Sequence, residues 1–197
     1  MRVSTHLIAG LVSIVASGSL AKDVGAARWF KISPAAVFET GDSWTDGGIA
    51  HRLYGVQACL RGTSFTNSSG VKCDCGEASL AMLVALIRDL QPQCHQAAAS
   101  TNSRRVLVLC VATRIGGVGA GSRLDLATAL IASGFAFASI AVDGRPVHEP
   151  YFVAQMVAAR SKAGLWAYPD TPEPNAIILR SLRDVGASGS PNQAAPR

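Results

Sequence analysis

Several features that mark common enzyme and membrane-protein classes are missing from this chain of 197 residues. No Gly-Lys-Ser or Gly-Lys-Thr occurs, which excludes a P-loop nucleotide site. No serine, cysteine or histidine stands in an arrangement typical of nucleophilic catalysis; the histidines are His6, His51, His95 and His148. No apolar run reaches the roughly 20 residues that a membrane-spanning helix needs.

Charge is sparse as well. The chain has 18 basic and 13 acidic residues, a net charge of +5, and only 16% of its residues are charged. A positive excess favours a polyanionic partner such as nucleic acid or an acidic polysaccharide. The excess is spread thinly without a long basic run, so a surface with a slight positive balance accounts for the same counts and is the plainer interpretation.

The first residues have the composition of an export signal. Arg2 supplies positive charge, Leu7 to Ala16 is almost wholly apolar, and Ser19-Leu20-Ala21 fits a small-x-small cleavage site. We expect residues 1–21 to be a signal peptide that is cut after Ala21. Its removal takes away Arg2, so the net charge of the mature chain is 17 − 13 = +4. The expected destination is the periplasm or the outside of the cell.

The chain contains five cysteines, which are Cys59, Cys73, Cys75, Cys94 and Cys110. In an oxidising compartment such residues are more often cross-linked than reactive, so we expect two disulfides and one spare thiol. A zinc site is the competing interpretation. It fits poorly, because Cys73-x-Cys75 lacks the usual two-residue spacer and only His95 lies near another cysteine.

Apolar periodicity predicts an α+β protein. Extended segments are expected at 29–39, 49–56, 91–96, 104–112 and 135–142, and helices at 76–90, 123–133 and 151–165. Strands that come first and helices that alternate with later strands suit a small barrel. We expect a polar loop at 61–74, one globular domain at 28–168, and a largely disordered tail at 169–197.

One segment imitates a dinucleotide-binding unit. The apolar stretch Val106–Ala112 is followed by glycines between 116 and 121 and then by the helical segment. Ser122 occupies the third glycine position, and three residues separate the strand from the glycines. We therefore expect a hairpin-type loop here, and no nucleotide cofactor.

Six fragments, in order over about residues 37–166, resemble the staphylococcal-nuclease-like (thermonuclease) family. They are Thr40-Gly41-Asp42-Ser43, Arg52-Leu53-Tyr54-Gly55-Val56-Gln57-Ala58-Cys59-Leu60, Gly76-Glu77-Ala78, Arg104 with Cys110, Asp125 to Ala136, and Ala158 to Trp166. Each fragment alone is weak, but their shared order makes the resemblance specific. It implies an OB-fold, a five-stranded β-barrel with about three helices.

The resemblance also implies a disulfide pattern. Exported members carry one cysteine pair across the loop after the first motif and one between neighbouring strands. Transferred to this chain, that pattern pairs Cys59 with Cys75 and Cys94 with Cys110, which leaves Cys73 as the spare, although Cys73 and Cys75 could exchange roles.

The resemblance assigns roles to catalytic positions, and two of these positions have changed. Family members hold the phosphate with two arginines, bind Ca²⁺ through aspartates and act on water with a glutamate. Arg52 and Arg104 match the arginines and Asp42 matches one aspartate. Gln57 stands where the second aspartate belongs and Leu60 where the glutamate belongs, so Ca²⁺ affinity should fall and no base is present.

These losses favour a degenerate, monomeric accessory protein over an efficient enzyme. Some exported proteins of this type occur in bacterial exopolysaccharide (succinoglycan) gene clusters, which implies a role in exopolysaccharide production. Two alternatives stay open. One is a Ca²⁺-dependent endonuclease that cleaves DNA or RNA with a replacement carboxylate such as Asp46 or Glu77. The other is an interaction protein that binds an acidic polysaccharide.

Overall fold

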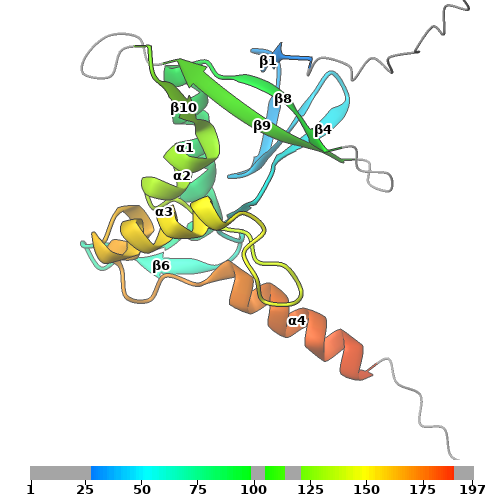
Figure 1. The fold of residues 1–197 in the computed structure, drawn as a ribbon. Helices are drawn as coiled ribbons and strands as arrows, with labels where there is room; N and C mark the ends of the chain where they lie inside the picture. Colours follow the sequence, from blue (N-terminus) through cyan, green and yellow to red (C-terminus); the bar gives the residue numbers. More distant parts are fainter. Residues whose placement is uncertain (1–27, 99–104, 114–120, 189–197) are drawn as a thin grey trace, which may run out of the picture.

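The computed structural model describes residues 28–98, 105–113 and 121–188, and Figure 1 shows their fold. The expected signal peptide lies outside these residues. The strands are β1 (Phe30–Lys31), β2 (Val37–Thr40), β3 (Ser43–Asp46), β4 (Ile49–Leu53), β5 (Val56–Ala58), β6 (Ser64–Thr66), β7 (Lys72–Asp74), β8 (Gln93–Ala98), β9 (Arg105–Thr113), β10 (Arg123–Asp125) and β11 (Ala136–Ala138). The helices are α1 (Cys75–Leu90), α2 (Leu126–Ala132), α3 (Glu149–Arg160), the 3₁₀-helix η1 (Gly164–Ala167) and α4 (Pro174–Ser188).

The main sheet is curled into a half-barrel and runs in the order β1-β8-β9-β4-β3-β2, with β10 paired to β9. Most neighbours are antiparallel, but β4 and β9 are parallel and align Arg52 with Leu107. Two small sheets, β5 with β11 and β6 with β7, complete the described strands. The α+β class is therefore as expected.

Helix α1 forms where the apolar spacing predicts it. The Asp74 side chain accepts a hydrogen bond from the Glu77 backbone N–H at 2.9 Å and caps the first turn. This bond lowers the pKa of the Asp74 carboxyl, because it stabilises the charged form. The helix buries Leu83 against the inner face of the curled sheet, in the core that also contains Trp44 and Val108.

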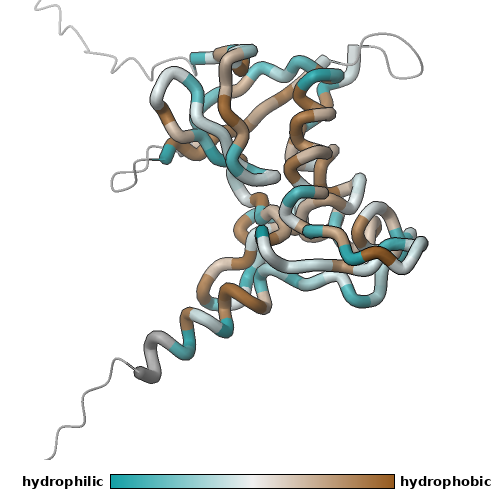
Figure 2. The backbone as a smooth tube through the Cα atoms, turned by 180° about the vertical axis from the view of Figure 1, so that it is seen from behind, coloured by the Kyte–Doolittle hydropathy of each residue, from teal (hydrophilic) through white to brown (hydrophobic). Residues whose placement is uncertain are grey.

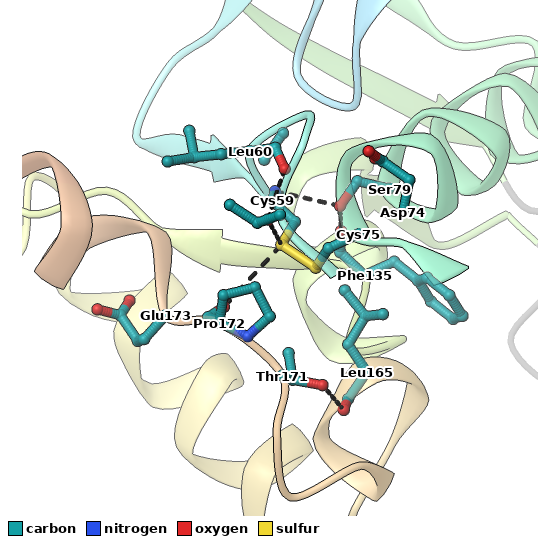
Figure 3. Close-up of a disulfide and its surroundings, with 12 residues drawn as sticks. Cys59, Leu60, Asp74, Cys75, Ser79, Phe135, Leu165, Thr171, Pro172 and Glu173 are labelled. Carbon is teal, nitrogen blue, oxygen red and sulfur yellow. Dashed lines mark hydrogen bonds between the residues drawn. A yellow bond between two sulfur atoms is a disulfide. The ribbon is translucent and has the colours of Figure 1, made fainter. Parts of the chain in front are cut away.

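The two disulfides are Cys59–Cys75 and Cys94–Cys110, the pairs that the resemblance implies. Cys94 and Cys110 are register partners on β8 and β9, with Cα atoms 3.9 Å apart. Cys59 follows β5 and joins the first residue of α1 (Figure 3). Cys73 is the free cysteine and is partly exposed. Two disulfides are typical of a protein that folds in an oxidising compartment.

The largest departure from the expectations is the C-terminal segment, which was expected to be mostly disordered. Residues 174–188 form α4, which projects from the body in Figure 1. Hydrophobic and hydrophilic residues alternate along it in Figure 2, as in an amphipathic helix. The buried Asn175 fixes its first turn: its side chain donates to the Ala138 carbonyl at 3.0 Å and accepts from the Ile140 N–H at 3.2 Å.

Two smaller departures have local causes. The expected polar loop at 61–74 contains the hairpin β6–β7, because the Asn67 side chain accepts the backbone N–H groups of Ser69 and Val71 and closes a tight turn. The helix expected from residue 123 begins at Leu126, because Asp125 caps it and accepts the Thr128 N–H at 2.7 Å. Within the described ranges, no helix is long and apolar enough to span a bilayer.

Candidate functional site

A cleft of about 300 Å³ lies where the turn before β3, the strands β4 and β5, the start of β9 and helix α4 meet. Its lining residues come from five separate parts of the chain. They are Thr40, Asp42, Arg52, Gln57, Ala58, Cys59, Leu60, Arg61, Arg105 and Ile178. Four residues that the sequence singles out, Asp42, Arg52, Gln57 and Leu60, therefore converge at one place.

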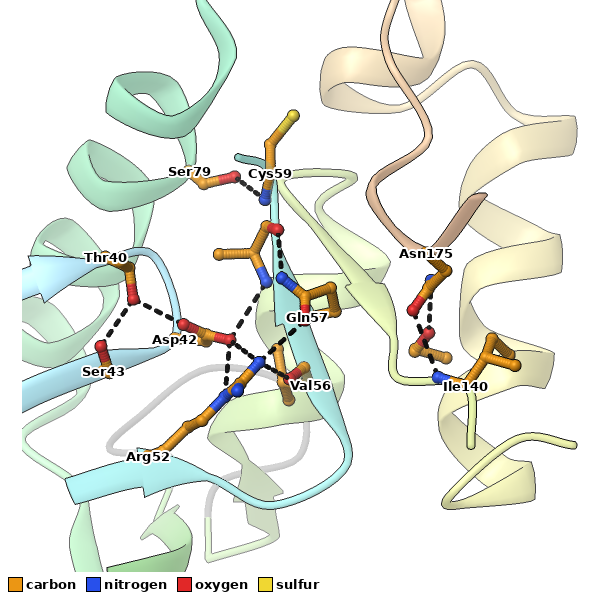
Figure 4. A network of polar contacts seen from close by, with 12 residues as sticks. Thr40, Asp42, Ser43, Arg52, Val56, Gln57, Cys59, Ser79, Ile140 and Asn175 are labelled. Carbon is orange, nitrogen blue, oxygen red and sulfur yellow. Dashed lines mark hydrogen bonds and ion pairs between the residues drawn. The ribbon is translucent and has the colours of Figure 1, made fainter. Parts of the chain in front are cut away.

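The centre of the cleft is an ion pair between Asp42 and Arg52 (Figure 4). Arg52 Nη2 and Nε lie 2.8 Å and 3.0 Å from Asp42 Oδ2, which also accepts the Ala58 backbone N–H at 3.2 Å. The other carboxylate oxygen, Oδ1, accepts the Thr40 hydroxyl at 2.6 Å. The Asp42 side chain is 5% exposed and that of Arg52 is 30% exposed. Both oxygens of the buried carboxylate are therefore engaged.

Gln57 completes the cluster from β5. Its Oε1 accepts from Arg52 Nη2 at 2.8 Å, and its Nε2 donates to the Ala58 carbonyl at 2.9 Å. A carboxylate at this position would give the arginine two acidic neighbours and the cluster a net negative charge. The neutral amide holds the same guanidinium and leaves Asp42 and Arg52 as a balanced pair.

Packing against α1 determines the shape of the turn that presents Asp42. A Cβ atom on Gly41 would lie 2.7 Å from the backbone carbonyl carbon of Ser79, so only glycine lets the helix cross this closely. The Ser79 hydroxyl is buried, accepts the Cys59 backbone N–H at 3.2 Å and donates to the Phe135 carbonyl. Gly41 and Ser79 thus position the cleft through packing.

The resemblance places a catalytic glutamate at Leu60, and the structure places this leucine in the cleft lining. Its apolar side chain offers no proton acceptor there. The suggested replacement carboxylates lie elsewhere or are paired. Asp46 accepts the Ser33 backbone N–H and does not line the cleft. Glu77 lies in the first turn of α1, where its carboxylate pairs with Arg61 at 3.1 Å.

Arg104, the second arginine of the expected pair, lies outside the described residues. Its neighbour Arg105 opens β9 and lines the cleft, with Ala50 of β4 as its register partner. Ala50 and Arg52 are two residues apart on one strand, so Arg105 lies on the same face of the sheet as Arg52. The sequence offers no clear signal for Arg105, because residues 106–112 are all apolar and show no alternation that would assign faces of the strand.

Sequence reasoning missed two further lining residues. Arg61 comes three residues after β5 and is the third arginine of the lining, after Arg52 and Arg105. Ile178 comes from α4, which was expected to be disordered, and gives the cleft an apolar wall. No pattern in the sequence connects position 178 to a cleft whose other lining residues lie more than 70 positions earlier. That contact depends on how Asn175 fixes the helix.

The donor set does not fit Ca²⁺. This ion takes six to eight oxygen ligands, among them several carboxylates. In the described part of the lining the only carboxylate is Asp42, and its oxygens already accept from Arg52, Ala58 and Thr40. Nowhere in the described residues do three or more His, Cys, Asp or Glu side chains form a group that could hold a metal.

No family model matches the chain, and no curated protein matches it significantly. The resemblance to the thermonuclease family therefore depends on the motifs of the chain itself.

Proposed function

We propose that this protein is an exported, nuclease-like OB-fold protein that has lost efficient phosphodiester cleavage and acts as a polyanion-binding accessory factor. The observation that carries the proposal is the closed cluster of Asp42, Arg52 and Gln57 beside Leu60. Metal-dependent hydrolysis needs free carboxylates and a base, and the described lining offers neither.

Charge in the cleft supports an anionic ligand. Three of the described lining residues are arginines, Arg52, Arg61 and Arg105, whereas Asp42 is the one acidic residue among them. The ion pair of Arg61 with Glu77 is about half exposed and therefore weak enough for a ligand to replace it.

An acidic polysaccharide is the ligand that this lining fits best. No aromatic side chain is among the described lining residues, and single-stranded nucleic acid binding depends largely on such side chains for base stacking. A carboxylate-bearing polysaccharide needs only cations and hydrogen bonds. The accessory role would then be in the production or export of an acidic exopolysaccharide such as succinoglycan.

A binding assay tests this proposal. Fluorescently labelled succinylated polysaccharide should bind with an affinity that falls as salt rises, and a neutral glycan should not bind. Arg105→Ala and Arg61→Ala should each weaken binding and make the affinity less dependent on salt. Lys72→Ala is the matched control, because Lys72 lies on β7 and does not line the cleft.

A digestion assay separates the proposal from the nuclease alternative. Single-stranded DNA and RNA should stay intact with the protein and Ca²⁺, with or without chelator. Cleavage that needs Ca²⁺ and disappears in Arg52→Ala, with circular dichroism showing that the variant is still folded, would instead establish a working endonuclease. Equal binding of succinylated and neutral glycans would refute the polyanion-binding role.

A further inference from the structure

A second concave surface lies between α1 and the β1–β2 connection, and it shares no lining residue with the cleft. Its larger part is an apolar hollow of about 650 Å³ that contains Ile32, Phe38 and Ile87. An adjoining polar hollow of about 310 Å³ contains Trp29 and Arg123. Lys31 and Gln91 line both hollows, so the two hollows adjoin at these residues, and together they are called the groove.

The apolar part of the groove is bordered by a face of α1 that the core covers only in part. Val84, Ile87, Arg88 and Gln91 recur at the three- and four-residue spacing of one helix face, and all line the hollow. Val84 is 39% exposed although the valine lies in the middle of the helix. An apolar hollow of this size, open to solvent, suits an alkyl chain.

The polar part of the groove is positively charged. Lys31 and Arg123 line it, and the Arg123 guanidinium lies 5.6 Å from the centre of the Trp29 ring. Arg88 at the apolar end is paired with Asp89 at 2.8 Å, so it adds little charge. Not one of the residues described as lining either hollow is an aspartate or a glutamate. The charge at one end and the apolar surface at the other complement an amphiphile with an anionic head.

We propose that this groove binds a single-chain alkyl phosphate, with the chain in the apolar hollow and the phosphate in the hollow lined by Lys31 and Arg123. Two cations match a phosphate monoester, which carries about −1.5 to −2 charges at pH 7, better than a single carboxylate. Trp29, which is 41% exposed, lies beside the headgroup and would report its arrival.

Calorimetric titration of the full chain with alkyl phosphates below their micelle concentrations tests the proposal. Affinity should rise about fourfold for each methylene added from octyl to dodecyl phosphate, because each one buries apolar surface. Dodecanoate should bind more weakly than dodecyl phosphate. Dodecyltrimethylammonium and inorganic phosphate should not bind, since each lacks one of the two required parts.

Matched variants locate the site. Val84→Asp should abolish binding, whereas Val153→Asp, the same change at an exposed valine in the middle of α3, should not. Lys31→Gln changes only an exposed side chain and should weaken the binding of dodecyl phosphate severalfold. Equal affinities for octyl and dodecyl phosphate, or full binding by Val84→Asp, would overturn the proposal. The proposal would also be overturned if the protein bound an acidic amphipathic peptide but none of the alkyl amphiphiles.

Discussion

At the scale of single residues, Arg52 stabilises the fold, whether or not it also binds a ligand. Its guanidinium neutralises a carboxylate that is almost fully buried, and it joins that carboxylate to Gln57 on the next strand. A buried charge that loses its partner is strongly destabilising, since neither water nor another group replaces the partner. Loss of function in an Arg52 variant is therefore not sufficient evidence of catalysis.

A double-mutant cycle tests this role. Arg52→Ala should lower the free energy of unfolding by about 2 kcal/mol, because Asp42 is left charged and unpaired. Combining it with Asp42→Asn should recover part of that loss, about 1 kcal/mol, since the lone charge is gone. Urea denaturation of the wild type, both single variants and the double variant gives the coupling energy. Additive effects would contradict the role.

His51 predicts how stability depends on pH. His51 is 7% exposed, and its ring lies between Phe30 and Trp44, with ring centroids 5.1 Å and 5.7 Å away. Burial lowers the pKa of His51, and the charge of Asp46 opposes this shift only partly. The unfolded chain therefore takes up a proton on this residue near pH 6.5, whereas the native state takes it up only at a lower pH, so this contribution to stability is full above about pH 7 and falls below it.

The variant His51→Phe isolates this contribution, because it keeps an aromatic ring and removes the titration. Free energies of unfolding from urea denaturation at about pH 5, 6 and 7 should rise with pH in the wild type and rise less steeply in the variant. Equal slopes would show that other groups cause the pH dependence.

At the scale of elements, local signals predicted some segments well. Helix α1 was expected at 76–90 and spans Cys75–Leu90, because its apolar spacing and the capping Asp74 are close in sequence. Helix α4 was missed, because its position depends on hydrogen bonds from Asn175 to residues more than 30 positions earlier. The same limit applies to the cleft. Its motif residues were found, but Ile178 was not.

Asn175→Ala should detach α4 with little effect on the rest of the fold. The variant loses both side-chain hydrogen bonds to the segment that ends β11, which stabilise the docked helix by about 1–3 kcal/mol. Amide hydrogen exchange should speed up in residues 176–184 and stay unchanged in β9. Ser181→Ala is the control, because its hydroxyl bonds only to the Ile177 carbonyl within the helix. Slow exchange in both variants would show that α4 is held in another way.

At the scale of the whole molecule, two cross-links of equal span hold different parts of the fold. Both disulfides join cysteines 16 residues apart. Cys94–Cys110 joins two strands of the main sheet. Cys59–Cys75 ties the cleft to α1 and lies against the chain before α4, with Cys59 Sγ 3.9 Å from the Pro172 carbonyl oxygen (Figure 3).

Because the two disulfides close loops of the same length, removing either one should lower the free energy of unfolding by the same amount. Cys59→Ala with Cys75→Ala, and Cys94→Ala with Cys110→Ala, should each lower the free energy of unfolding by about 3 kcal/mol. Only the first pair should also weaken ligand binding in the cleft. The unfolded wild type should show one reactive thiol, that of Cys73. Losses that differ by more than about 2 kcal/mol would contradict the loop-length explanation.

The wall that Ile178 gives the cleft determines how samples of this protein should be prepared. A truncated version that stops before residue 174 would keep the arginines but open one side of the cavity to solvent. Affinities measured on it would understate those of the intact chain.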